Sequence, residues 1–134
     1  MNSNATLSSG DKATDLIMET AYSFQKSRIL LSAFELNFFT IIGDDEKSSK
    51  EVALAANTNE RATERLLDAL VSVELLRKRH RSYSNIEELK NVVIEGRAGF
   101  VSGMSHARQQ WNMWSNLTQA VKTGTSPMPL MHSE

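Results

Sequence analysis

The carboxylates of Asp44, Asp45 and Glu46 are the densest group of side chains in this sequence that could exchange protons. They follow Gly43 in a turn-like segment without the apolar surroundings that raise a carboxyl pKa, so they do not predict acid–base catalysis. The histidines stand far apart, and no pair has the spacing of metal ligands: His80, His106 and His132. The sequence therefore predicts no metal site.

Other common catalytic patterns are also missing. There is no cysteine, which excludes disulfides, thiolate zinc sites and a cysteine nucleophile. Gly96, Gly99 and Gly103 do not follow a predicted strand, as the glycines of a phosphate-binding loop would. No G-x-S-x-G motif is present. We therefore expect no catalytic, cofactor-binding or metal-binding residue in this chain.

A basic cluster follows the most regular part of the sequence and could contact nucleic-acid phosphates. It comprises Arg77, Lys78, Arg79 and Arg81, beside His80. The preceding predicted helix opposes this interpretation, because four acids and only two bases occupy its polar positions. A helix in the DNA major groove should be neutral or basic. Nucleic-acid binding is therefore kept only as the alternative, and charges that protect a sheet edge are the simpler explanation.

The stretch that carries this cluster, residues 48–86, predicts a winged helix-turn-helix. Ser48 and Glu51 have the spacing of a capping box, Asn57 suits a left-handed helix end, and Thr58 is expected to cap a second helix. Two short strands, 75–79 and 82–86, should form a two-stranded β wing that turns at His80 and Arg81.

The second helix of this stretch should lie at the centre of a small helical core. Ala62, Leu66, Ala69 or Leu70, and Val73 fall on one face of a 3.6-residue period. Leu67 and other apolar residues widen that face, as is typical of a helix buried on more than one side.

Residues 11–42 are unusually rich in apolar side chains for one surface helix. Their hydrophobic residues either form the core of the monomer or cover a contact with another chain, and the residues leave both options open. The candidates for a dimer interface are Leu16, Ile17, Phe24, Leu30, Phe34 and Phe38.

A long amphipathic helix is predicted over residues 100–123, ended by Gly124. Phe100, Met104, Trp111 and Trp114 lie on its apolar stripe and could line a ligand pocket, although core or interface packing is the simpler role for the tryptophans. So much aromatic area near a chain end needs burial by a partner or by a further domain.

Composition bounds the class of protein. The 134 residues have a formal net charge of −1, which gives no global field for nucleic acid or membrane. The first ten residues are polar and expected to be disordered, and they do not resemble a signal peptide. No apolar run is long enough for a bilayer. We expect a cytoplasmic protein that binds no membrane, with one domain at residues 11–124 and a linker at 125–134.

The order of short motifs resembles the N-terminal dimerisation domain of S-adenosylmethionine-dependent O-methyltransferases of the hydroxyindole and plant caffeate type. Residues 33–39, AFELNFF, are similar to the family's A-x-E-L-G-[LI]-F, and residues 65–70, RLLDAL, to its R-L-L-[RD]-A-L. Similar matches occur at 49–53, 83–85 and 114–124. Asn37 and Glu74 stand where the family usually has glycine, and glutamate is costly there if its φ is positive.

This resemblance implies a mainly α fold with a winged helix and an intertwined homodimer built through residues 11–42 and 100–123. It also implies that the domain walls the pocket for a small-molecule acceptor, with Phe100, Met104, Trp111 and Trp114 as candidates. S-adenosylmethionine and the catalytic residues would belong to a catalytic domain beyond Glu134. The 134 residues alone are then expected to bind no cofactor and to catalyse nothing.

Overall fold

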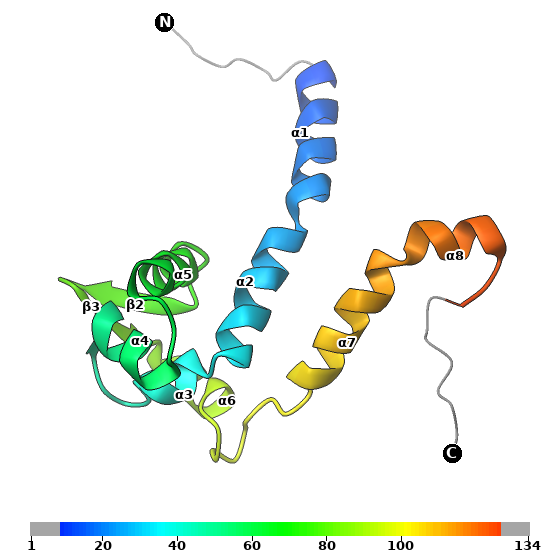
Figure 1. Cartoon of the computed structure of the whole chain (residues 1–134). Coiled ribbons are helices and arrows are strands. Elements are labelled where there is room, and N and C mark those ends of the chain that lie inside the picture. The colour runs from blue at the N-terminus through cyan, green and yellow to red at the C-terminus, as the bar shows by residue number, and fades with distance from the viewer. Residues whose placement is uncertain (1–8, 127–134) are drawn as a thin grey trace, which may run out of the picture.

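The computed structural model describes residues 9–126, which are mainly helical and carry a small antiparallel sheet (Figure 1). The helices are α1 (Ser9–Tyr22), α2 (Phe24–Glu35), α3 (Phe38–Ile42), α4 (Ser49–Ala56), α5 (Glu60–Ser72), α6 (Lys90–Val93), α7 (Met104–Ser115) and α8 (Leu117–Thr123). The strands are β1 (Lys47–Ser48), β2 (Leu76–Arg79) and β3 (Ser82–Asn85), and a 3₁₀ turn spans Glu87–Leu89.

These elements form a body and two arms (Figure 1). The body, residues 29–95, contains the sheet, the end of α2 and helices α3 to α6. The N-terminal arm, residues 9–28, is α1 with the start of α2. The C-terminal arm, residues 104–123, is α7 with α8. The free ends of α1 and α8 point away from the body.

One hydrophobic core holds the body together. It contains the fully buried side chains of α3, α4 and α5 and the inward face of the hairpin. Its buried members are Ala33, Phe38, Phe39, Ile42, Val52, Leu67, Leu70, Leu76, Tyr83, Val93 and Ile94. The arms contribute none of these residues, so the core is complete without them.

The predicted capping box at the start of α4 is confirmed. The Ser48 hydroxyl accepts the Glu51 backbone N–H at 3.2 Å, and the Ser48 N–H donates to the Glu51 carboxylate at 3.1 Å. These hydrogen bonds lower the pKa of Glu51. The predicted left-handed end is also confirmed, because Asn57 has a φ of 55°.

Helix α5 differs from the prediction in its cap and in its buried face. Asn59, and not Thr58, accepts the N–H of Ala62 and caps the helix, while the Thr58 hydroxyl bonds that of Thr63 at 2.6 Å. The buried residues of α5 are Thr63, Leu67 and Leu70; Leu67 and Leu70 were among the predicted apolar positions, whereas the predicted Ala62 is exposed and Thr63 takes its place. The Thr58–Thr63 bond satisfies a hydroxyl that would otherwise be buried without a partner.

The sheet has three strands, where the sequence predicted two. Strand β3 lies between β1 and β2, antiparallel to both, with Ser48 opposite Ser82 and Arg79 opposite the same serine. The two residues of β1 are too few to give a readable alternation, so the prediction missed them. The turn at His80 and Arg81 is confirmed, with a φ of 56° at His80.

A buried asparagine joins the sheet to α3. The Asn85 side-chain amide donates to the carbonyls of Phe39 and Gly43, at 2.9 Å each. The Gly43 carbonyl lies just past the C-terminal end of α3, where the helix provides no donor, and the Phe39 carbonyl also accepts the Gly43 N–H at 2.9 Å. Asn85 thus completes the end of a helix that lies more than 40 positions earlier in the chain.

The N-terminal arm exposes its whole length. Every residue of α1 whose side chain is described is exposed, and burial begins only in the second half of α2. The sequence predicted a start at Asp11 or Thr14, and α1 instead begins at Ser9. The disorder expected for residues 1–10 is wrong for Ser9 and Gly10, which belong to α1, and residues 1–8 lie outside the described residues.

The C-terminal arm is two helices, and the single helix predicted for residues 100–123 is wrong. The first begins at Met104, after a connection that includes Phe100, and the arm breaks at Asn116. Around the break, the Ser115 hydroxyl donates to the Trp111 carbonyl and the Asn116 amide to the Asn112 carbonyl. Such side-chain bonds to the backbone compete with regular helix geometry. Of the expected linker, residues 127–134 lie outside the described residues.

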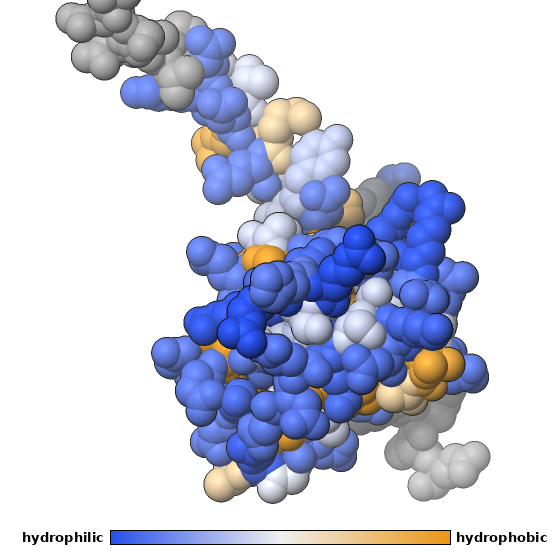
Figure 2. Space-filling view, turned by 90° about the vertical axis from the view of Figure 1, so that its left-hand side faces the viewer, coloured by the Kyte–Doolittle hydropathy of each residue, from blue (hydrophilic) through white to orange (hydrophobic). Residues whose placement is uncertain are grey.

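The face that carries the sheet and its neighbouring helices is predominantly hydrophilic, whereas apolar side chains show along the N-terminal arm (Figure 2). None of the helices within residues 9–126 combines the length and the apolar character needed to cross a membrane.

Candidate functional site

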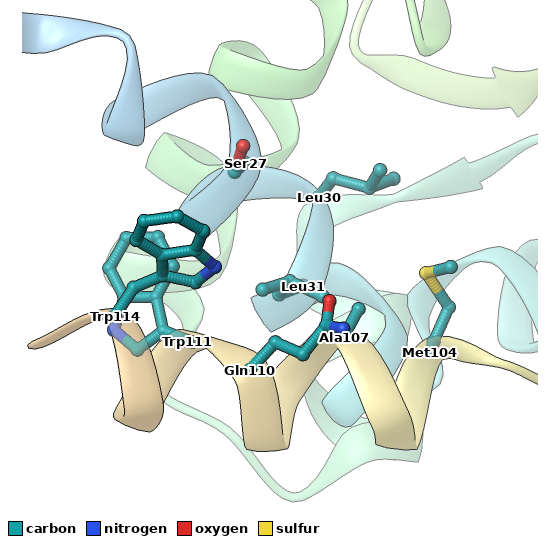
Figure 3. A pocket seen from close by; sticks show the side chains of 8 residues that line it. All are labelled: Ser27, Leu30, Leu31, Met104, Ala107, Gln110, Trp111 and Trp114. Atoms are coloured by element: carbon teal, nitrogen blue, oxygen red, sulfur yellow. The ribbon is translucent and has the colours of Figure 1, made fainter. Parts of the chain in front are cut away.

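The candidate site is an open groove of about 390 Å³ where α7 crosses α2. Helix α2 contributes Ser27, Leu30 and Leu31, and α7 contributes Met104, Ala107, Gln110, Trp111 and Trp114. The tryptophans lie at one end of the groove and Met104 at the other (Figure 3). Its lining is mostly apolar, and its hydrogen-bonding groups are the Ser27 hydroxyl, the Gln110 amide and the indole N–H groups of Trp111 and Trp114.

Helical periodicity brings these side chains to one place. On α7, the spacings of 3, 4 and 3 between Met104, Ala107, Trp111 and Trp114 place them on one side of the helix. The face of α2 across the groove is continuous with the core, because Leu30 packs against the core cluster. One wall of the groove is therefore anchored in the body and the other belongs to the C-terminal arm.

A polar contact on α2 fixes the arm beside the groove. The Arg28 guanidinium lies over the Trp111 ring, 5.3 Å from its centroid, and donates to Glu35 at 2.8 Å and to the Ser32 hydroxyl. Arg108 of α7 approaches the same Glu35 at 4.0 Å. Cation–π and ion-pair contacts of this kind are weak at exposed sites but set the orientation of the indole.

The structure places three of the four predicted pocket residues in the groove: Met104, Trp111 and Trp114. Phe100 is not among its lining residues. It lies before α7 and packs edge-on against Phe34, with ring centroids 6.4 Å apart. Its role is therefore to attach the connection to the body.

The predicted interface residues fall into three groups. Leu16, Ile17 and Phe24 are exposed on the N-terminal arm, and Phe24 also contacts Trp111 with ring centroids 6.4 Å apart. Leu30 lines the groove, and Phe34 packs against the core. Phe38 needs correction, because it is 0% exposed within the body and has no surface to offer a second chain.

Four groove residues were not predicted as site residues: Ser27, Leu31, Ala107 and Gln110. The spacing of the α7 stripe includes Ala107 and could have identified it. Nothing in the sequence indicates which turn of α2 faces α7, so Ser27 and Leu31 could not have been assigned. Gln110 lies on the same stretch of α7, and its amide contacts the His106 ring nitrogen at 3.1 Å.

The carboxylates of the acidic turn form ion pairs that brace the body. Asp44 pairs with Arg97 and Lys90, Asp45 with Lys47, and Glu46 with Arg79. These contacts connect the turn to the sheet and to the start of the connection towards α7. No group of His, Cys, Asp and Glu within residues 9–126 could hold a metal ion.

The basic hairpin is largely balanced by neighbouring acids. Lys78 donates to Asp68 at 2.8 Å and lies over the Tyr83 ring, and the Tyr83 hydroxyl donates to the same carboxylate at 2.5 Å. The hydrogen bond to Asp68 raises the pKa of Lys78, and the bonds from Lys78 and Tyr83 lower the pKa of Asp68. Arg79 approaches Glu46 at 3.5 Å. Only Arg77 and Arg81 keep free charge, which does not support nucleic-acid binding.

Comparison with known proteins identifies the class. Residues 18–88 match the O-methyltransferase dimerisation domain, and the chain belongs to this family. The match begins inside α1 and ends after β3, so it includes part of the N-terminal arm and the body up to residue 88.

Individual relatives are methyltransferases by their names. The chain is 26% identical to the N,N-dimethyltransferase OxyT of Streptomyces rimosus, over 81% of this chain and 32% of the relative. It is 29% identical to the tetracenomycin polyketide synthesis 8-O-methyl transferase TcmO of Streptomyces glaucescens, over 84% and 34%. The chain thus spans about a third of the length of these curated relatives.

Among solved structures, the chain is similar to human N-acetylserotonin methyltransferase in complex with SAM. The TM-score is 0.75 and the identity 27%, over 93% of this chain and 40% of that one. The helices and the sheet are therefore arranged as in the corresponding part of that enzyme.

Proposed function

We propose that this chain forms an intertwined homodimer and that it walls the acceptor pocket of an S-adenosylmethionine-dependent O-methyltransferase. The observation that carries the dimer is the N-terminal arm, where Leu16 and Ile17 are about two-thirds exposed on a helix that contributes nothing to the core. Burying one such side chain yields roughly 1.5–3 kcal/mol, so a second copy is the simplest source of its burial.

The groove supports the pocket-walling part of the proposal. Met104, Trp111 and Trp114 give flat apolar surface suited to a small aromatic acceptor, and Ser27 and Gln110 could orient its polar groups. The relatives OxyT and TcmO are named for methyl transfer to nitrogen and to oxygen, so the acceptor atom is not set by this domain.

The remaining parts of the proposal follow from the family. Helices α4 and α5 with the sheet are assigned as a winged helix that serves as a scaffold. S-adenosylmethionine is assigned to the catalytic part of the whole enzyme, beyond residue 134, and the enzyme to the cytoplasm. Methyl transfer is accordingly expected from the whole enzyme and not from these residues alone.

The dimer is tested by replacing Ile17 with glutamate. Ile17→Glu places a charge on the apolar face of α1 and should raise the dimer dissociation constant by at least about 100-fold, as for a central interface residue. The matched control is Leu54→Glu, because Leu54 is 75% exposed on the body and away from both arms. Sedimentation velocity of the 134-residue chain gives the constants. A monomeric wild type, or equal effects of both variants, contradicts the proposal.

The pocket is tested on the whole enzyme. Trp114→Ala should raise KM for the acceptor about tenfold with little change in KM for S-adenosylmethionine, because in the proposed arrangement the indole contacts the acceptor and not the cofactor. An unchanged KM for the acceptor rejects this part of the proposal and leaves the dimer untouched.

A further inference from the structure

The groove between α2 and α7 offers a bound molecule few hydrogen-bond acceptors and no charge. None of its eight lining side chains is charged, so an ion that leaves water to enter it gains no partner. The indole N–H groups of Trp111 and Trp114 only donate hydrogen bonds. The side-chain oxygens that can accept a hydrogen bond from a bound molecule are therefore those of Ser27, on α2, and Gln110, on α7.

The Gln110 amide is oriented by a contact one helical turn away. Its nitrogen lies 3.1 Å from Nε2 of His106. An amide nitrogen donates and does not accept, so Nε2 of His106 is the acceptor and the imidazole is neutral, with its proton on Nδ1. The amide of Gln110 cannot turn over without losing this hydrogen bond. His106 thus determines which end of the amide is held against α7.

The other end of the amide faces the groove. Figure 3 shows Gln110 between the tryptophans and Met104, with its amide oxygen pointing toward α2. Within residues 9–126, this oxygen accepts no hydrogen bond from another residue. Gln110 therefore offers an oriented and unoccupied acceptor near the middle of the groove.

The groove has room for a molecule of more than one ring. From Met104 to Trp114, α7 rises by about 15 Å, which is longer than a single benzene ring. A flat molecule stacked at the tryptophan end would extend past the oxygen of Gln110. If its edge carried no donor at that point, it would exclude water from the oxygen and leave the oxygen without a partner, which costs binding energy.

We propose that Gln110 selects acceptor molecules that are uncharged and carry a hydrogen-bond donor besides the group that is methylated, and that His106 positions the amide for this contact. The inference rests on the proposed acceptor pocket and names a residue that determines its specificity. The donor is a second group, because the group that receives the methyl must face the S-adenosylmethionine assigned to the catalytic part of the enzyme.

Binding can be measured in the 134-residue chain itself, because its two tryptophans, Trp111 and Trp114, both line the groove. In the nitrogen-15-labelled chain, their indole N–H resonances give dissociation constants by NMR titration. The probes are indole and 1-methylindole, which share two fused rings and differ by one N–H donor. The dissociation constant of 1-methylindole divided by that of indole measures the preference for a donor. Comparing this ratio between variants cancels the larger apolar surface of 1-methylindole.

Gln110→Leu should lower the ratio about fivefold, as expected for the loss of one neutral hydrogen bond. His106→Leu should also lower it, because the amide is then free to rotate. His106→Gln should preserve it, because the oxygen of the new amide can accept the same N–H. The controls are Gln109→Leu, which removes the neighbouring amide outside the lining of the groove, and Ser27→Ala, which removes the other oxygen. Both controls should leave the ratio unchanged.

Four outcomes would overturn all or part of the inference. If Ser27→Ala lowers the ratio and Gln110→Leu does not, the opposite wall selects the donor. If both probes bind and the ratio is the same in wild type and in Gln110→Leu, Gln110 selects nothing, while the proposed pocket stands. If His106→Gln lowers the ratio as much as His106→Leu, His106 does not position the amide. If neither probe shifts the indole resonances, the proposed pocket fails as well.

Discussion

The body buries its large apolar side chains within one chain, whereas the arms leave several of theirs exposed. In the body, Phe38, Leu67 and Tyr83 are almost completely buried, and the charges around them form ion pairs within the same chain. In the arms, Ile17, Trp114 and Val121 remain exposed on helices that extend from the body. The difference indicates that the body has the features of an independent folding unit, whereas the arms are built for assembly.

The largest difference in stability is expected when one leucine is replaced in the body and one in the C-terminal arm. Leu67→Ala removes a fully buried side chain and should lower the free energy of unfolding by about 2–5 kcal/mol, through lost burial and the cavity left behind. Leu117→Ala in the C-terminal arm should change it by less than about 0.5 kcal/mol in dilute protein. Urea unfolding followed by circular dichroism gives both values, and similar losses would remove the distinction between body and arms.

A second test uses the acid side of the stability curve. Because Lys78 and Tyr83 lower the folded-state pKa of Asp68, the stabilisation is present above its unfolded pKa and is lost as the pH falls through the folded pKa. The free energy of unfolding should therefore decrease once the pH falls below 3.8, the ordinary pKa of aspartate. In Asp68→Asn the free energy of unfolding should depend less steeply on pH in this range, whereas Glu64→Gln on the same helix should leave the dependence unchanged. An unchanged slope in Asp68→Asn means that this ion pair contributes nothing.

Tyr83→Phe tests the hydrogen bond from the Tyr83 hydroxyl to Asp68 without removing a charged side chain. Loss of the hydroxyl should cost about 1 kcal/mol at neutral pH, the usual contribution of one hydrogen bond. The ring remains buried, so the core is unchanged and the effect reports on the bond to Asp68. A variant as stable as wild type would show that water replaces Tyr83 as a donor at no cost.

The smallest expected effect is an increase in stability, whereas the preceding variants lower it. Glu74 has a φ of 65° at the end of α5, a conformation that glycine adopts without strain. Glu74→Gly should therefore stabilise the body by roughly 0.5–1 kcal/mol, the strain relieved less the entropy that glycine loses. Glu64→Gly, in the middle of α5, should destabilise it by about 1 kcal/mol. Equal signs would show that backbone strain at Glu74 is negligible.

The body was largely predictable, because its signals are local. The capping box at Ser48, the left-handed helix end at Asn57 and the turn at His80 and Arg81 all depend on a few neighbouring residues, whereas the cost at Glu74 was indicated only by the family resemblance. Strand β1 was missed, because it depends on a partner strand brought near by folding. The cap of α5 is a local contact from the Ala62 N–H to Asn59, and asparagine is a better cap than threonine by type, so local signals could have identified it.

The candidate site was predictable only in part. Periodicity identified Met104, Trp111 and Trp114, but it also placed Phe100 on a helix that begins four residues later. The opposite wall, Ser27 and Leu31, depends on how α7 crosses α2, and the sequence does not encode that crossing in any local pattern. The exposure of α1 could not be distinguished from core burial before the structure was known.

The hydrogen bonds of Asn85 bear on the order in which the body forms. Helix α3 has five residues, too few to persist in water without support. The carbonyls of Phe39 and Gly43 are bonded by Asn85, which reaches them only after the hairpin has docked. Helix α3 and the hairpin should therefore become protected from hydrogen exchange together, as one cooperative unit, although half the body lies between them in sequence.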